Sequence, residues 1–363
     1  MRSGSMPYVP ALDGLRGIAV ALVVCAHVVP GFTAGRVGVD VFFVLSGYLI
    51  TTILLREWTA RGRIDLRAFY LRRLLRLGPP LAVVLAAYIL ATPVWVSRGV
   101  TLEQLTTVWV AAATYTWNLL IVGLGVLPTG AAGALSHLWS LGQEEQFYLV
   151  FPLVLVLVLR RRSQPRVLLR ALLGLAVVML LLYVLTAGTL FAEFGPVTRG
   201  FGLLVGSALA VGRWGGQAYA VRRWLALGAV LVVGIVITGA VLRWLPGDAD
   251  IPAAVCVAVL VIAHVTGHGE GALSRLLAFR PLVWLGLVSY SLYLWHLPLV
   301  VLAADVWHLG SLGVAAFALP TALALAELTR RLVEEPAARV KERWVRARTA
   351  PGMLGDPAPA ALE

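Results

Sequence analysis

The chain has 363 residues, of which 60% are hydrophobic and only 13% charged, with a formal net charge of +12. Its mean hydropathy of +0.88 lies outside the range of soluble globular domains, and several apolar runs are long enough to cross roughly 30 Å of hydrocarbon. The basic excess does not indicate nucleic-acid binding, because the basic residues gather in short blocks between hydrophobic runs, as in cytoplasmic loops. We therefore expect an all-α, polytopic transmembrane helix bundle whose partner is the lipid bilayer and not nucleic acid.

Eleven apolar runs can be marked along the chain. They are 12–29, 38–55, 77–97, 105–124, 138–159, 167–190, 200–212, 224–244, 250–267, 281–303 and 309–329. If every run crossed the membrane, the arginine-rich blocks 56–76 and 160–170 would lie on opposite sides, against the positive-inside rule. The run best suited to stay uncrossed is 105–124, because its four threonines and one asparagine need polar partners that a re-entrant or bundle-buried segment finds within the protein.

Ten of the eleven runs then remain as spans, and both termini lie in the cytoplasm. This arrangement places 26 of the 30 basic residues on the cytoplasmic side and leaves outside only Arg36, Arg98, Arg199 and Arg243. We expect one transmembrane domain over residues 1–348, a Pro/Ala-rich disordered cytoplasmic tail over 349–363, and a multi-pass location in the cell membrane.

The first span carries an ionisable residue near each end. In "LDGLRGIAVALVVCAHV", Arg16 and His27 are eleven positions apart, which in an α-helix is three turns plus about 20° and about 16 Å of rise. The two side chains therefore share one face of the helix. Because ionisable groups inside a bilayer usually face a bundle interior or a wet cavity, this face is a candidate functional groove. The alternative for Arg16 is that it snorkels to the interface.

Three further spans bring polar residues toward the outer half of the bundle. They are Asp40 and Ser46 in "GVDVFFVLSGYLI", His137, Glu144 and Glu145 in "SHLWSLGQEEQFYLVFP", and Tyr290 and His296 in "WLGLVSYSLYLWHLPL". With His27, they predict that carboxyl, imidazole and hydroxyl groups gather in one place. A carboxylate there would orient the ring of His27, and the other residues would line a substrate site.

Some of these residues also have a purely structural explanation. Asp40 can cap the second span. Ser140 with Gln143 fits a helix-capping box, in which case Glu144 and Glu145 only favour the positive N-terminus of their helix.

The remaining polar residues of the spans are explained in the same way. Ser46, followed by Gly47, can be a helix-packing residue, and His296 can simply donate to a backbone carbonyl. His264 and His268 lie at i and i+4, but no carboxylate accompanies them in a zinc-binding arrangement. We expect no metal cofactor.

The block "FYLRRLLRLGPP" places Arg72, Arg73 and Arg76 just before a span, on the cytoplasmic side. Guanidinium groups bind phosphate through paired donors, so this block predicts a phosphate-binding site. The positive-inside rule alone is the alternative explanation. A bundle with phosphate-binding groups inside and a histidine toward the outside could activate a hydroxyl for attack on a thioester.

In this order, these stretches and the closing "LVEEP" resemble the bacterial acyltransferase 3 family of integral-membrane O-acyltransferases, over about residues 8–340. The resemblance implies a ten-helix bundle that moves an acyl group, often acetyl, from acyl-CoA (in the first instance acetyl-CoA) to a hydroxyl of a carbohydrate, glycosylated or small-molecule acceptor. Many members carry a fused extracellular SGNH-type domain; because this chain stops after a short tail, we expect direct transfer by the bundle.

The resemblance also implies roles for particular residues. His27 would be the catalytic base, and Arg16 would hold the donor or the geometry of the active site. Arg73 and Arg76, spaced as the family's Arg-x-x-Arg, would contact the phosphates of coenzyme A. Glu144 and Glu145 match the family's Glu-Glu-Gln-Phe-Tyr element.

Two other function classes stay open on the sequence. Buried His, Arg and Glu side chains also form proton or substrate pathways in secondary transporters. A non-catalytic membrane partner that binds acyl lipids or sugars would have the same composition. Turnover of labelled acetyl-CoA separates these classes, because a transporter leaves the thioester intact and a binding partner shows no turnover.

Overall fold

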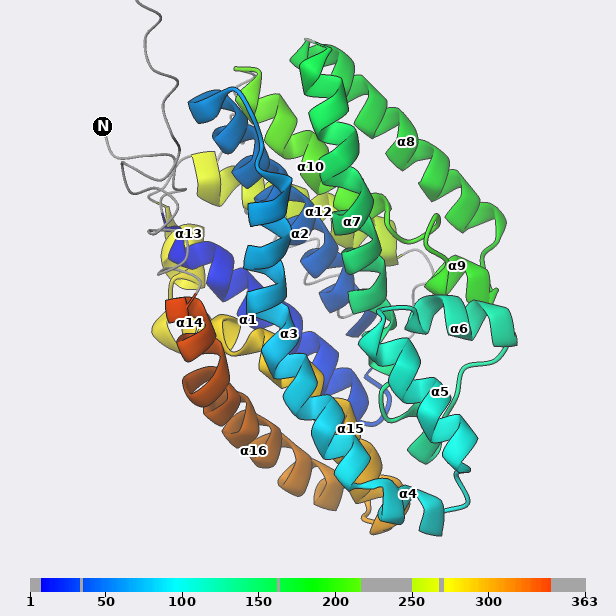
Figure 1. Cartoon of the computed structure of the whole chain (residues 1–363). Coiled ribbons are helices and arrows are strands. Elements are labelled where there is room, and N and C mark those ends of the chain that lie inside the picture. The colour runs from blue at the N-terminus through cyan, green and yellow to red at the C-terminus, as the bar shows by residue number, and fades with distance from the viewer. Residues whose placement is uncertain (1–7, 33–34, 162–163, 217–249, 268–270, 341–363) are drawn as a thin grey trace, which may run out of the picture.

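A computed structural model describes residues 8–32, 35–161, 164–216, 250–267 and 271–340, and all of its regular secondary structure is helical (Figure 1). Several expectations from the sequence lie outside the described residues. They concern Arg2, the apolar run 224–244, Arg243, His268 and the tail 349–363.

Within the described residues, seven helices are long and apolar enough to cross a membrane. They are α1 (Pro10–Val28), α2 (Gly35–Arg61), α3 (Leu66–Leu90), α7 (Trp139–Arg160), α8 (Pro165–Leu185), α15 (Ser289–Val301) with the π turn η3 (Leu302–Val306), and α16 (Ser311–Thr329) with the π turn η4 (Arg330–Glu334). Two shorter apolar helices are α10 (Phe201–Trp214) and α12 (Asp250–Gly267). The all-helical membrane bundle is confirmed, and the count of ten spans stays a prediction.

The remaining elements are short. They are α4 (Thr92–Ser97), α5 (Leu102–Ala113), α6 (Trp117–Leu124), α9 (Leu190–Phe194), α13 (Ala272–Leu277), α14 (Arg280–Leu287) and the 3₁₀ turns η1 (Gly130–Gly133) and η2 (Ser136–Leu138). The run 105–124, which we expect not to cross, is divided between α5 and α6 at Tyr115, whose φ of 58° lies in the left-handed region. At 1.5 Å per residue, these helices are about 18 and 12 Å long, too short for a span.

Two helix boundaries differ from the sequence expectation in ways that matter for the site. Asp65 caps α3 by accepting a hydrogen bond from the Ala68 amide, so the helix starts well before the apolar run. The arginines of the "FYLRRLLRLGPP" block therefore lie within α3 and not in a loop before it. The apolar run 281–303 breaks at Val288, so that Ser289 begins a new helix, α15.

Glycines allow the central helices to approach closely. A Cβ at Gly47 of α2 would lie 1.9 Å from the Leu203 carbonyl oxygen of α10, and one at Gly206 would lie 2.1 Å from the Val44 carbonyl oxygen. Small residues at such positions let transmembrane helices pack backbone against backbone. In Figure 1, α1 and α2 cross the middle of the bundle, α3 lies in front of them, and α5 and α6 lie at the right.

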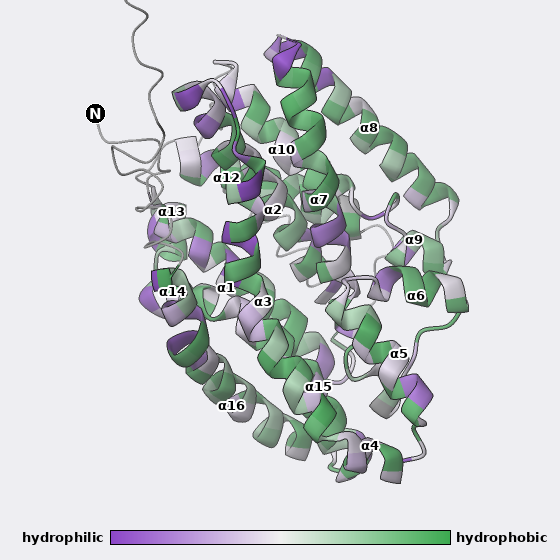
Figure 2. Cartoon of the chain, in the orientation of Figure 1, coloured by the Kyte–Doolittle hydropathy of each residue, from purple (hydrophilic) through white to green (hydrophobic). Residues whose placement is uncertain are grey.

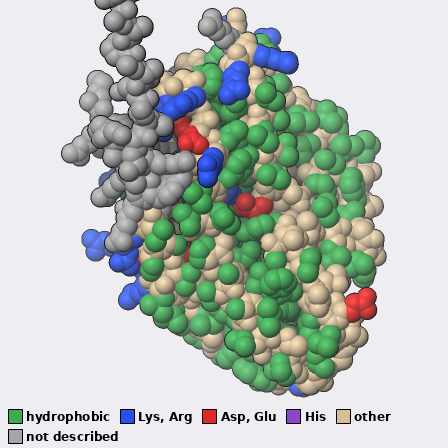
Figure 3. Space-filling view, in the orientation of Figure 1, with side chains coloured by type: hydrophobic (Ala, Val, Ile, Leu, Met, Phe, Trp, Pro, Cys, Tyr) green, Lys and Arg blue, Asp and Glu red, His purple; other side chains and the backbone are tan. Residues whose placement is uncertain are grey.

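The surface agrees with a membrane location. Figure 2 shows mainly apolar residues along the long helices, and Figure 3 shows hydrophobic side chains over most of the visible face. Basic side chains gather along its upper and left rim. The positive-inside rule predicts that this rim lies on the cytoplasmic side.

Candidate active site

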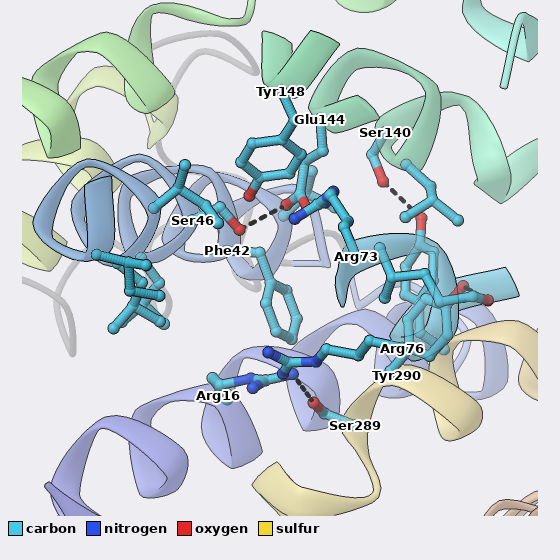
Figure 4. Close-up of a pocket in the computed structure, with 18 residues that line it drawn as sticks. Arg16, Phe42, Ser46, Arg73, Arg76, Ser140, Glu144, Tyr148, Ser289 and Tyr290 are labelled. Atoms are coloured by element: carbon cyan, nitrogen blue, oxygen red, sulfur yellow. Dashed lines mark hydrogen bonds between the residues drawn. The ribbon is translucent and has the colours of Figure 1, made fainter. Parts of the chain in front are cut away.

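A cavity of about 270 Å³ lies inside the bundle, bordered by α1, α2, α3, α7 and α15 (Figure 4). One wall is an apolar stripe of α2, which includes Phe42, Leu49 and Ile53. The polar lining residues are Arg16, Ser46, Arg73, Arg76, Ser140, Glu144, Tyr148, Ser289, Tyr290 and Tyr293. Four of the stretches singled out in the sequence, together with the arginine block, therefore converge on one pocket.

Two arginines from different helices meet in this pocket. Arg16 donates from Nη2 to Ser289 Oγ at 3.2 Å, and its Nη1 is 3.9 Å from Asp13 Oδ1. Arg76 reaches in from α3, and Figure 4 shows its guanidinium beside that of Arg16. Within the described chain, Arg76 has no hydrogen bond or ion pair. Two neighbouring positive charges in a partly apolar pocket repel one another, so the site favours an anion. Arg16 thus connects α1 to α15 and lines the pocket.

The other two arginines of the block are already paired. Arg73 donates from Nε to Glu145 Oε2 at 2.9 Å, with a second contact between Nη2 and Oε1, and its guanidinium lies 3.3 Å from the centre of the Tyr148 ring. Arg72 contacts Glu57 at 3.4 Å. The structure therefore leaves Arg76, and not the whole arginine block, free to meet a ligand.

The carboxylates lie with the arginines and not with the histidines. Glu144 accepts a hydrogen bond from Ser46 Oγ at 3.1 Å and faces the pocket, and Glu145 is bound to Arg73. In the described chain, neither carboxylate is hydrogen bonded to His27. The prediction that one of these carboxylates orients the His27 ring is thus wrong. Both Glu residues lie in α7, about two helical turns further along the chain than His137.

The helix-capping explanation for this stretch is also wrong. Ser140 lies within α7, where its Oγ is 2.8 Å from the hydroxyl oxygen of Tyr293. Gln143 donates from Nε2 to the carbonyl oxygens of Phe194 and Gly195, at 3.0 and 2.9 Å. Both side chains thus connect α7 to other elements.

His27 is exposed in the last turn of α1, about three helical turns from Arg16. Its Nδ1 lies 2.8 Å from the Val23 carbonyl oxygen. A carbonyl oxygen can only accept, so in the neutral ring Nδ1 carries the proton and Nε2 has the lone pair. Within the described residues nothing is hydrogen bonded to Nε2. This nitrogen is therefore available as a base.

Two buried histidines lie next to it. The ring of His296 is 5.0 Å from that of His27 and 4.9 Å from that of His137, measured between centroids. His296 Nδ1 is 2.6 Å from the Tyr293 carbonyl oxygen, as the structural alternative predicts. In the structure as described, His296 Nε2 and both ring nitrogens of His137 are buried without a hydrogen-bond partner. Such groups are rare in folded proteins and indicate a place for a polar ligand or water.

Asp40 is neither a helix cap nor part of the pocket. It lies inside α2, fully buried, and accepts hydrogen bonds from Arg199 at 3.0 and 3.3 Å. Arg199 also donates to Glu193 Oε2 at 3.0 Å, and Arg36 contacts the same carboxylate. This buried network holds the α9 region against α2, so the substrate-contact role expected for Asp40 has no support in the geometry.

The structure adds residues that the sequence reading missed. Tyr293 lines the pocket beside Ser140 and touches both buried histidines. Glu334, in the closing "LVEEP", accepts a hydrogen bond from Ser291 of α15. Their positions in the sequence could have indicated them. Tyr293 lies about one helical turn before His296, and Glu334 is an acidic residue at the end of an apolar helix.

Residues 9–329 of the chain match the family described as "Acyltransferase domain". A relative from Listeria monocytogenes named "Peptidoglycan O-acetyltransferase OatA" is 32% identical over 92% of the chain, and one from Staphylococcus aureus named "O-acetyltransferase OatA" is 33% identical over 91%. A relative from Bacillus subtilis named "Putative peptidoglycan O-acetyltransferase YrhL" is 34% identical over 91% of the chain. The chain spans 56%, 57% and 55% of the length of these three relatives, in that order. No solved structure matches the chain.

Proposed function

Because the chain belongs to the acyltransferase 3 family, we propose that it is a membrane-embedded O-acyltransferase. It moves an acyl group, in the first instance acetyl, from acyl-CoA to a hydroxyl of a carbohydrate or glycosylated acceptor. The names of the relatives support O-acetylation and a glycan acceptor. The observation that carries the proposal is the placement of an anion-seeking pocket and an available imidazole at two positions along α1.

The pocket suits the donor. Arg16 and Arg76 present two guanidiniums to an anion, and coenzyme A carries phosphates that such groups bind well. The α2 residues along the pocket run from Val39 to Ile53, which is about 21 Å of helix. That length and the mixed apolar and hydroxyl lining suit an extended pantetheine arm.

His27 suits the acceptor. Its Nε2 takes the proton from the acceptor hydroxyl while the hydroxyl oxygen attacks the thioester carbonyl carbon. The carbon–sulfur bond then breaks, and the imidazolium returns the proton to the thiolate, which leaves as coenzyme A. The Val23 carbonyl keeps the proton on Nδ1 and fixes the ring orientation, a task given to a carboxylate in many enzymes. No covalent enzyme intermediate is needed if donor and acceptor meet directly.

The test uses purified protein in lipid vesicles with radiolabelled acetyl-CoA and a soluble chitooligosaccharide as the acceptor. We expect release of thiol together with label in the oligosaccharide. Loss of a general base costs about 10²–10⁴-fold in rate, so His27→Ala should abolish measurable transfer while coenzyme A binding remains. Cys25→Ala, two residues earlier on α1, is the matched control and should keep the activity.

The same experiment separates the rival classes. A secondary transporter would accumulate substrate in the vesicles and leave the thioester intact. A non-catalytic binding partner would bind acetyl-CoA or glycan without turnover, with or without His27. If His27→Ala keeps near-wild-type turnover, the base is another group, and His137 and His296 become the candidates.

A further inference from the structure

Tyr293 lies between the donor pocket and the group of histidines that ends at the exposed base. Tyr293 lines the pocket, and its ring lies 5.0 Å from that of His137 and 5.5 Å from that of His296. His296 in turn lies against His27. A line of polar side chains therefore leads from the pocket to the surface at His27, and Tyr293 occupies its inner end.

Two hydrogen bonds hold this tyrosine in place. Its hydroxyl is 2.8 Å from Ser140 Oγ, and it donates to the carbonyl oxygen of His137. Both partners belong to the segment that begins α7, so the hydroxyl joins α15 to that segment. Tyr293, Ser140 and His137 are all at least nine-tenths buried. The ring thus packs between the pocket and the two buried histidines.

Beyond this tyrosine, the bundle has polar groups without partners. Both ring nitrogens of His137 and Nε2 of His296 are buried and unbonded within the described chain. Unsatisfied polar groups at this depth are costly, so a hydroxyl of the acceptor or a water molecule would be stabilised beside them. A thioester in the pocket would meet that water at once if Tyr293 were absent.

We infer that Tyr293 is the barrier between the donor pocket and the acceptor side of the active site, and that it moves aside only when acyl transfer takes place. This inference rests on the thioester donor proposed above. With the barrier closed, water on the acceptor side cannot reach the thioester carbon. With the barrier open and no acceptor present, a water oxygen bonds to the acyl carbon, the carbon–sulfur bond breaks, and the protons of water are shared between the thiolate and the released carboxylate. Exclusion of water is a general task of such closures.

The first test measures this leak. Tyr293→Phe keeps the ring and removes both hydrogen bonds, each of which shifts a closed–open equilibrium by about 2- to 12-fold. We expect thiol release from acetyl-CoA without acceptor to rise by about 5- to 150-fold, and transfer per thiol released to fall. Tyr70→Phe is the control, because it also removes a hydrogen bond from a tyrosine hydroxyl to a backbone carbonyl, that of Leu149 at 2.8 Å, and Tyr70 does not line the pocket. It should not raise the leak. Equal hydrolysis in wild type and Tyr293→Phe, or loss of all turnover in Tyr293→Phe, would overturn the inference.

The second test needs no donor and therefore stands if the proposed function fails. Cys25 and Cys256 are replaced by alanine, and Ser46→Cys places a thiol in the pocket. A membrane-impermeant thiol reagent is added to intact cells in one arm and to inside-out vesicles in the other. The first arm exposes the outer side of the membrane and the second the cytoplasmic side, so one of them presents the side where His27 is exposed. On the side where His27 is exposed, the thiol should stay unlabelled behind Tyr293 and become labelled with Tyr293→Phe, but not with Tyr70→Phe. If the thiol is labelled to the same extent with and without Tyr293→Phe, Tyr293 is not the barrier. If labelling depends on Tyr293 but the protein does not turn over the thioester, the barrier stands and only the proposed function is contradicted.

Discussion

At the scale of single residues, pairing decides what a charged side chain can do. Arg72, Arg73 and Arg76 look equivalent in the sequence, since all three lie within five positions. The fold gives Glu57 to the first and Glu145 to the second, and these ion pairs use the donors that a phosphate would need. Arg76 keeps its donors and stands beside Arg16 in the pocket.

Replacement of Arg76 should therefore act on the donor. Each hydrogen bond to a charged group contributes about 1.5–3 kcal/mol, so Arg76→Ala should raise the KM for acetyl-CoA by about 10- to 150-fold, with a much smaller change for the acceptor. Steady-state kinetics with each substrate varied in turn measures this. Arg61→Ala removes the same charge from an exposed position at the end of α2 and should leave the donor KM near that of the wild type. An unchanged donor KM in Arg76→Ala would mean that this arginine only marks the topology.

At the scale of elements, close backbone contacts place the helices that carry the site. Gly47 follows Ser46 on α2. From the sequence, Ser46 could be either a helix-packing residue or part of a substrate site. The glycine packs against the α10 backbone at Leu203, while the serine faces the pocket and binds Glu144. Helix packing and ligand contact are therefore not alternatives here, because neighbouring residues on a helix point in different directions.

A single methyl group at this contact should be harmful. A Cβ at Gly47 would overlap the Leu203 carbonyl, and overpacking of this kind costs about 1–3 kcal/mol. We expect Gly47→Ala to lower the apparent melting temperature of the purified protein in detergent by several degrees.

Gly174 in α8 supplies the matched control, since a Cβ there meets nothing within 4 Å. Replacement of a helical glycine by alanine at such a position is favourable by about 0.5–1 kcal/mol, so Gly174→Ala should melt at the same temperature as wild type or above it. Equal melting of the two variants would mean that α2 and α10 can separate without cost.

At the scale of the whole molecule, charge and helix length both bear on the topology. The basic residues gather at one end of the described bundle, and the run 105–124 is broken into two helices, each too short to cross. Both facts agree with an arrangement in which this segment enters and leaves on the same side.

Accessibility labelling measures that arrangement directly. In a background without Cys25 and Cys256, single cysteines at Glu103 and Val126, both exposed residues that flank the segment, should react with an impermeant maleimide added outside intact cells. Labelling of one position from outside and of the other only after the membrane is opened would contradict the ten-span topology. A cysteine at Arg61 should label only from the cytoplasmic side.

The class of the protein could be predicted from the sequence alone, because hydrophobic runs and the clustering of basic residues follow directly from the energetics of the bilayer. The sequence also pointed to Arg16, His27, Glu144 and His296, since ionisable side chains are costly in membrane helices unless they have a role. How these groups combine could not be predicted in the same way. Contacts between distant segments depend on helix rotation and depth, which spacing along one helix does not define. For this reason the sequence did not show that Glu144 and Glu145 contact Ser46 and Arg73, or that Asp40 pairs with Arg199. Nor did it show that His27 packs against another histidine.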